Sequence, residues 1–461
     1  MSEMNKDYYS IQDKLEDLKA SPAALTILSR VMDLIKNTAG EEVGEKISGL
    51  LKSTQGDSLS FETLCKYAGG AVTKEQLDAT NDALQKIRKP LDVEYNEEFP
   101  LTADAAKTNK VTYDCIHSGE PVYDTNGYRI QTHGGAVYFE DGVYYWYGEN
   151  KNRTDGKNGV WTWGMKMYKS TDLYNWEDLG YFIPPEFTNK NSGMYPEKHA
   201  DRPHILKSET TGKYVCWIKQ SGEEACFLIL QSDALTGPYE VMKEEYRPFG
   251  HKVGDFDMIR SKKDGKVYLF MDADHKGIYG YRVSEDLLTL EEEISRQYED
   301  LYAPFTREAV ALFERGDKIY MLTSGMSGYI PNKSDLAVTD DWNKPFEPIG
   351  DPHIGDDSKS SFNSQISQVF KVDGKEDFYI SIGDRWVPDY PVDAHRADLI
   401  ERSIAAHYAP DQYQVTEEEK RELMDSPMLG SANTSKADYV WLPVEFKEDK
   451  PYISWKDTWT V

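Results

Sequence analysis

Acidic and amide side chains recur in this sequence at the starts of short apolar runs. Glu308 directly precedes the run 309–312, and Asp255 and Asp257 precede the run 258–259. Paired carboxylates can hydrolyse a glycosidic bond, because one protonates the leaving oxygen while a second group activates water. We therefore take Glu308 as the candidate acid and Asp257 as the neighbouring carboxylate that raises its pKa. The other runs offer Gln131, Thr132, His133, Glu149, Asp201, Arg202, Ser364 and Gln365.

Each of these residues, taken alone, also fits a turn cap or a solvated strand end. The hypothesis of a site depends on the same position recurring in successive repeats. A glycine turn followed by tyrosine in an apolar strand occurs at 141–147, 212–217, 264–270 and 316–322, with a looser copy at 373–382. Regular return of one hairpin favours radial repetition, which leaves few strand edges exposed. We predict an all-β, five-bladed β-propeller over residues 110–461; a β-sandwich is the alternative, but it does not explain the regular spacing.

The first 95 residues have helical rather than strand periodicity. Ser21-Pro22 is typical of a helix start, and Thr73 with Gln76 predicts a capping box. We predict a small α-helical domain over residues 1–95, which serves as an accessory or oligomerisation module and gives a homo-oligomer. A helical insertion is expected at about residues 390–435, before the last strands complete the ring.

Composition excludes several classes of partner. The 461 residues include 80 acidic and 53 basic ones, a formal net charge of −27, which repels nucleic acids and anionic membranes. The first residues lack the apolar segment of a signal peptide, so a cytoplasmic location is expected. The four cysteines lack zinc-ligand spacing, so no metal site is predicted from them, and we expect reduced thiols. The 31 tyrosines, 10 tryptophans and 16 phenylalanines suit sugar binding, so an oligosaccharide is the expected partner.

Several motifs occur in an order that resembles a known family. The sequence is similar to glycoside hydrolase family 43, in particular to the exo-β-1,3-galactosidase branch, over about residues 120–388 and 439–461. The motifs are Ile130-Gln131-Thr132-His133-Gly134-Gly135, Tyr145-Trp146-Tyr147-Gly148-Glu149, Asp201-Arg202-Pro203, Asp257-Met258, Arg307-Glu308-Ala309, Thr323-Ser324-Gly325, Ser364-Gln365, Gly383-Asp384-Arg385-Trp386 and Tyr439-Val440-Trp441-Leu442-Pro443, ending at Trp455 and Trp459.

The resemblance implies a five-bladed propeller and an inverting, exo-acting mechanism. It implies Glu308 as the general acid and Asp257 as the carboxylate that tunes and orients it. Glu149 and Asp201 fall where the family holds the hydroxyls of the terminal sugar, and Gln365 falls where the galactosidase branch faces the attacking water. The remaining predicted substrate-binding residues are Gln131, His133, Ser327, Asn332 and Trp386.

The first blade lacks the aspartate base of most family members, and His133-Gly134-Gly135 stands there instead. For this branch, the glutamine at position 365 has been proposed to act as its imidic-acid tautomer. A water held by Glu149 or Asp201, or His133 itself, are the alternatives. Asp201 also replaces a glutamate of close relatives, and Val310 replaces a proline. No cofactor is expected, although a single structural cation near the axis stays an open alternative.

Three functions follow from these observations. The first is an intracellular exo-glycosidase that releases galactose from β-1,3-linked galacto-oligosaccharides. The second is an α-L-arabinofuranosidase, β-galactofuranosidase or β-xylosidase of the same fold. The third is a non-catalytic sugar-binding propeller, against which the presence of both Glu308 and Asp257 argues.

Overall fold

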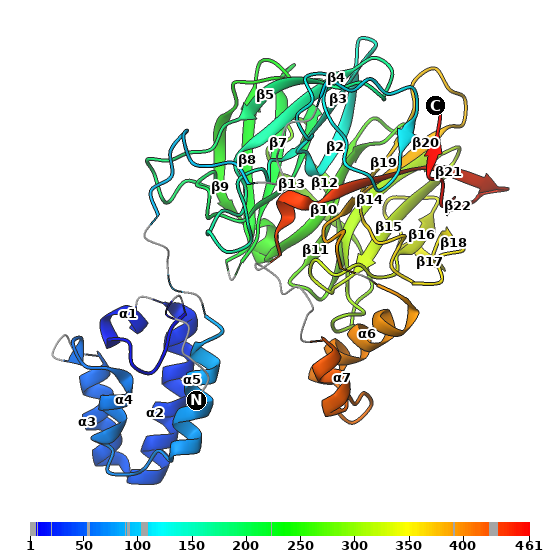
Figure 1. Ribbon diagram of the computed structural model, residues 1–461. Helices are drawn as coiled ribbons and strands as arrows, with labels where there is room; N and C mark the ends of the chain where they lie inside the picture. Colours follow the sequence, from blue (N-terminus) through cyan, green and yellow to red (C-terminus); the bar gives the residue numbers. More distant parts are fainter. Residues whose placement is uncertain are drawn as a thin grey trace. The chain divides into compact units, whose positions relative to one another are not determined.

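The computed structural model in Figure 1 has two units, Met1–Val93 and Glu94–Val461. It describes residues 6, 8–19, 21–52, 56–87, 89, 93–102, 109–222, 224–390, 392–423 and 432–461. Parts of the predicted helical domain and residues 391 and 424–431 of the predicted insertion therefore lie outside the described residues. None of the described helices is long and apolar enough to span a membrane.

The first unit is helical. Ser21 caps its second helix by accepting a hydrogen bond from the Ala24 N–H, and Thr73 and Gln76 form the predicted capping box. Apolar side chains from all five helices pack into one core that belongs to this unit alone. The helices are α1 (Leu15–Lys19), α2 (Pro22–Ala39), α3 (Glu41–Lys52), α4 (Phe61–Lys66) and α5 (Lys74–Leu84).

The second unit is the five-bladed β-propeller that the sequence predicts, with one sheet for each repeated hairpin. The first blade contains β2 (His133–Glu140), β3 (Val143–Glu149), β4 (Met165–Ser170) and β5 (Glu177–Ile183). The second contains β6 (Ala200–Lys207), β7 (Tyr214–Gln220), β8 (Cys226–Ser232) and β9 (Glu240–Tyr246). The third contains β10 (Val253–Arg260), β11 (Val267–Ala273), β12 (Gly277–Val283) and β13 (Leu290–Gln297). The fourth contains β14 (Arg307–Arg315), β15 (Lys318–Gly325), β16 (Asp335–Thr339) and β17 (Glu347–Gly350).

The fifth blade closes the ring with strands from distant parts of the chain. Its sheet has the order β18-β22-β21-β20-β19, and β18 runs parallel to β22. The helices of the insertion lie between β20 and β21 in the chain, and β1 pairs with β23 at the end of the sequence. The elements are β18 (His353–Ile354), β19 (Gln365–Lys371), β20 (Tyr379–Arg385), α6 (Ala394–Tyr408), α7 (Glu417–Glu422), β21 (Asp438–Lys447), β22 (Lys450–Ser454), β1 (Ile116–His117) and β23 (Thr458–Trp459).

Apolar side chains fill the space between every pair of neighbouring blades. Successive residues of a strand point to opposite faces of its sheet, so one strand contributes to two clusters. Trp146 packs toward the fifth blade, whereas Tyr147, the next residue, packs toward the second. The alternation of the sequence thus builds five inter-blade cores, and these cores fix the innermost strands around the axis.

The innermost strands β2, β6, β10, β14 and β19 each carry a β-bulge near the start. In three of these bulges a residue has positive φ: Gly134 at 58°, Arg202 at 49° and Ala309 at 53°. A bulge bends the strand and re-aims the side chains beside it. The bulges therefore decide which polar residues reach the site.

Candidate active site

Glu308 lies at the start of β14, half-buried and next to the bulge. Burial raises the pKa of its carboxyl to about 8, and the charge of Asp255 adds to the shift. Its Oε1 accepts a hydrogen bond of 3.1 Å from Gln365 Nε2. The carboxyl is therefore protonated at neutral pH, which is the form that can protonate a leaving oxygen.

The carboxylate beside Glu308 is Asp255, which corrects the prediction that Asp257 takes this place. Asp255 Oδ2 accepts a hydrogen bond of 3.2 Å from the backbone N–H of Ala309, the residue after Glu308. Asp257 instead accepts hydrogen bonds from the N–H groups of Met258 (2.8 Å) and Leu312 (2.7 Å). The bulge between Val253 and Phe256 is the cause, because it shifts the alternation of the strand.

Asp257 lines a separate cavity of about 670 Å³ formed by the later parts of the innermost strands. Its pKa rises to about 7 because the carboxyl is buried. The nearest histidine nitrogen, Nδ1 of His204, is 3.4 Å from its Oδ1. Asp257 therefore belongs to the other end of the axis.

The orientation of the Gln365 amide is fixed by its neighbours. Its Oε1 accepts hydrogen bonds from Arg202 Nη2 (3.1 Å) and from Trp386 Nε1 (3.0 Å). Both groups are donors only, so this atom must be an acceptor. An imidic acid would carry a proton on the same oxygen, without any acceptor to receive it. The arrangement therefore favours the ordinary amide form of Gln365.

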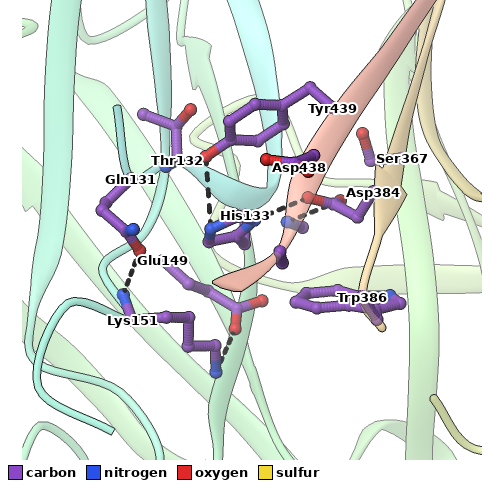
Figure 2. Close-up of polar contacts among 12 residues, drawn as sticks. Gln131, Thr132, His133, Glu149, Lys151, Ser367, Asp384, Trp386, Asp438 and Tyr439 are labelled. Carbon is purple, nitrogen blue, oxygen red and sulfur yellow. Dashed lines mark hydrogen bonds and ion pairs between the residues drawn. The ribbon is translucent and has the colours of Figure 1, made fainter. Parts of the chain in front are cut away.

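Glu149 and Asp201 form the opposite part of the site together with the buried Lys151. Figure 2 shows Glu149 and Lys151. Glu149 Oε1 accepts a hydrogen bond of 2.9 Å from the Arg202 N–H, and its Oε2 is 2.6 Å from Lys151 Nζ. Burial still raises the pKa of Glu149 to about 7. Burial would also raise the pKa of Asp201, but the nearby charges of Lys219 and Lys151 lower it.

Three cations lie among the carboxylates of the site: Lys151 and Lys219, which the sequence does not single out, and Arg202, which it does. Lys151 Nζ donates to the Trp161 carbonyl, and Lys219 Nζ lies 2.6 Å from Asp255 Oδ1. Arg202 Nε lies 2.9 Å from Asp255 Oδ2. The charges of Arg202 and Lys219 overcome the effect of burial and hold the pKa of Asp255 well below its usual range. Lysines at strand ends usually lie in solvent, so the sequence carries no signal that would have pointed to Lys151 or Lys219.

Gln131 and His133 lie behind the wall of the site, which corrects their prediction as substrate-binding residues. His133 is 0% exposed, and its ring stacks on Tyr439 with centroids 4.8 Å apart. Its Nδ1 is 3.0 Å from Asp384 Oδ1, and burial lowers its pKa (Figure 2). Gln131 Oε1 accepts a hydrogen bond from the Lys151 backbone N–H. Both residues position the strand ends.

Ser327 and Asn332, which the sequence predicts as sugar contacts, form hydrogen bonds within one loop. Asn332 forms reciprocal hydrogen bonds of 2.7 Å with the N–H and C=O of Gly325. It also donates to Ser327 Oγ, which in turn donates to the Ile330 carbonyl. Trp386, by contrast, does lie at the site, where it holds Gln365.

Within the described parts of the chain, no group of three or more His, Cys, Asp or Glu side chains could hold a metal ion. All four cysteines, Cys65, Cys115, Cys216 and Cys226, carry free thiols. The polar network around Glu308 thus consists of carboxylates, amides and basic side chains, a set suited to proton transfer and to binding hydroxyl groups.

The structure is similar to solved structures of β-1,3-galactosidases and of an exo-β-1,3-galactanase. A family 43 β-1,3-galactosidase matches with 26% sequence identity and a TM-score of 0.61, covering 76% of this chain and 64% of that one. A second, crystallised with galactodeoxynojirimycin, matches with 22% identity and a TM-score of 0.60, covering 75% of this chain and 100% of that one. The exo-β-1,3-galactanase from Phanerochaete chrysosporium, crystallised with galactose, matches with 20% identity and a TM-score of 0.59, covering 76% and 68%.

No curated protein matches the chain by sequence. The model of the family described as "Glycosyl hydrolases family 43" matches residues 135–382, more than half of the chain and most of the propeller. This stretch contains Glu149, Asp201, Asp255, Glu308 and Gln365. The chain belongs to glycosyl hydrolases family 43.

Proposed function

We propose that this glycoside hydrolase is an inverting, exo-acting enzyme that releases galactose from β-1,3-linked galacto-oligosaccharides. The observation that carries the proposal is Glu308, a carboxyl that is protonated at neutral pH and faces Gln365. A sugar-binding propeller without activity has no need of a protonated acid at its axis. Glu308 donates the proton that the leaving oxygen requires.

Glu149 is the group that we propose as the base for the attacking water. Gln365 is held as an amide, a poor base, by Arg202 and Trp386. Asp201 and Asp255 both have lowered pKa values, which makes them weak bases. Glu149, with a pKa of about 7, has a basicity close to the optimum for catalysis near neutral pH.

The choice of galactose rests on the structural relatives. The matched β-1,3-galactosidase shares 26% identity with this chain, and two further relatives were crystallised with galactose or a galactose-like inhibitor. In the proposed complex Asp201 binds a hydroxyl of the terminal sugar. Asp201 is itself held by Trp161 Nε1 at 2.5 Å and by Ser221 Oγ at 2.6 Å.

The replacement of Glu308 by glutamine tests the acid. We expect Glu308→Gln to lower kcat on β-1,3-galactobiose by a factor of about 10²–10⁴, while galactose binding survives. Hydrolysis of a dinitrophenyl β-galactoside should fall much less, because its leaving group needs no proton. Glu347→Gln, at an exposed position of the same blade, is the matched control. Wild-type activity of Glu308→Gln on the disaccharide would contradict the assignment.

A substrate panel tests the sugar. It contains β-1,3-galactobiose and the nitrophenyl glycosides of β-galactopyranose, α-L-arabinofuranose, β-galactofuranose and β-xylopyranose. Release of galactose from the disaccharide, without cleavage of the furanosides, is the expected result. Preferential cleavage of a furanoside or of the xyloside would instead assign the enzyme to another specificity of the same fold.

A further inference from the structure

An aromatic side chain from the fourth blade lies across the site. Tyr329 belongs to residues 326–331 between β15 and β16, which we call the Tyr329 loop. Its ring lies 6.0 Å from the ring of Trp161 and 5.3 Å from that of Trp386, measured between centroids. Trp161 holds Asp201, and Trp386 holds Gln365. Tyr329 thus bridges the two sides of the proposed sugar pocket.

The Tyr329 hydroxyl group lies in the field of the site carboxylates. Burial raises the pKa of the phenol well above its ordinary value, and the charges of Asp201, Glu149 and Asp255 add to the shift. Tyr329 lines a cavity of about 10 Å³ together with Gln365, Trp386 and Ser324. This volume holds about one water molecule and is too small for a sugar ring.

The Tyr329 loop is fixed at its base and independent at its tip. Asn332 and Gly325 join the two ends of the loop, and the Met326 N–H donates to the Pro304 carbonyl. Among the hydrogen bonds of the described residues, those formed by residues 327–331 stay within the loop and its base. Gly328, next to Tyr329, is exposed and has φ of +63°. The tip can therefore pivot without breaking hydrogen bonds to the blades.

We propose that the Tyr329 loop is a lid that lifts to admit the terminal sugar and then closes over it, with Tyr329 as the residue that seals the pocket. The proposal rests on the proposed function, because it takes a chain-end sugar as the ligand. A lid of this kind must close over a chain end, since an internal sugar unit continues into the chain on both sides. Tyr329 is accordingly a specificity-determining residue for exo-acting hydrolysis. The closed lid also keeps bulk water away from Glu308.

The rate at which Glu308 reacts with a water-soluble carbodiimide and glycine ethyl ester tests the lid without any substrate. Labelling is measured by peptide mass spectrometry at pH 6.5 in the full chain. In the wild-type chain we expect slow labelling, limited by lid opening. Tyr329→Ala should raise the rate at Glu308 at least tenfold, and Tyr329→Phe, which keeps the ring, should change it less than threefold.

Two controls are part of the same experiment. Asp257, a protonatable carboxyl in the cavity at the other end of the axis, should keep its labelling rate in every variant. Tyr408→Ala, at an exposed position of the helical insertion, should leave Glu308 unchanged. If the Tyr329→Ala chain unfolds, the labelling of Asp257 rises as well. In that case Asn332→Ala, which releases the base of the loop, replaces Tyr329→Ala in the experiment. The same increase in labelling at Glu308 is expected.

Equal Glu308 labelling in wild-type, Tyr329→Ala and Asn332→Ala chains would overturn the lid. Because the reagent needs no sugar, this outcome is separate from the hydrolysis assay. If the variants change Glu308 labelling as expected but the chain lacks galactosidase activity, the proposed substrate is wrong and the lid proposal still holds.

Discussion

The carboxylates around the axis differ in pKa because the buried cations are divided unequally among them. Arg202 and Lys219 both contact Asp255, which stays ionised. Glu308 receives no such direct ion pair among the described residues and accepts a hydrogen bond from an amide instead. One group is therefore a fixed charge and its neighbour a proton donor. This division is what general acid catalysis requires.

Asp255 and Asp257 provide a matched pair of substitutions for this account. We expect a bell-shaped profile of kcat/KM, in which Glu149 ionises near pH 7 and Glu308 loses its proton near pH 8. Asp255→Asn removes a negative charge that opposes ionisation of Glu308, and it takes one ion-pair partner away from both Arg202 and Lys219. The pKa of Glu308 must therefore fall, and the basic limb should move to lower pH by about one unit or more.

Asp257→Asn is the control for that profile, because Asp257 lies at the other end of the axis. Its basic limb should coincide with that of the wild-type enzyme. A shift in Asp257→Asn without one in Asp255→Asn would restore the assignment that the sequence suggested and contradict the one made from the structure.

The sequence was sufficient to predict that Glu308, Glu149 and Gln365 lie close together, because each belongs to a motif at a strand end. It was insufficient for Asp255, since two aspartates with a single residue between them cannot be ranked when a bulge shifts the alternation. Lys151 was missed for a different reason. A lysine after a strand usually extends into solvent, whereas the ammonium group of Lys151 is buried beside the Glu149 carboxylate.

The bulge in β2 shows how an element sets the site. At Gly134, an added Cβ would lie 2.3 Å from Glu149 Oε1, and the backbone has positive φ. Glycine at this position therefore lets the Glu149 carboxylate approach the strand. Because Glu149 packs against the backbone of Gly134, no side chain, and therefore no carboxylate, fits at position 134.

Gly134→Ala should displace Glu149 and lower kcat/KM by at least tenfold. Gly142→Ala is the matched control: it lies in the β2–β3 turn with φ of 80°, and an added Cβ there meets open space. It should cost roughly 1–2 kcal/mol of stability and leave activity unchanged. Thermal unfolding and kinetics on the same samples separate the two effects. Equal activity of both variants would show that the bulge does not position Glu149.

Turn glycines with tyrosine-rich strands were enough to predict the blades, because this pattern is local. The bulges and the Tyr329 loop were beyond prediction, since neither has a sequence signal that distinguishes it from an ordinary strand or turn. Ser327 and Asn332 show how an unpredicted loop conformation affects the prediction of site residues. Their polar side chains suit a sugar, but the closed loop uses them for its own hydrogen bonds.

At the scale of the whole molecule, each unit has a core of its own. The helical core and the five inter-blade cores share no residue, and the chain divides at Val93. We propose that the helical unit mediates association between chains and takes no part in hydrolysis.

Removal of residues 1–93 should therefore leave kcat/KM within about twofold of the full chain, while the mass measured by light scattering falls to that of a monomer. An inactive but folded propeller would instead show that the helical unit contributes to the site. An unchanged oligomeric state would contradict its proposed role in association.

The anomeric form of the first product tests the central claim most directly. Proton NMR, recorded within the first minutes of β-1,3-galactobiose hydrolysis, distinguishes α-galactose from β-galactose before the two equilibrate. The account predicts α-galactose first, because water attacks from the face opposite the leaving group that Glu308 protonates. β-Galactose as the first product would contradict it, since retention requires a carboxylate nucleophile in place of the activated water.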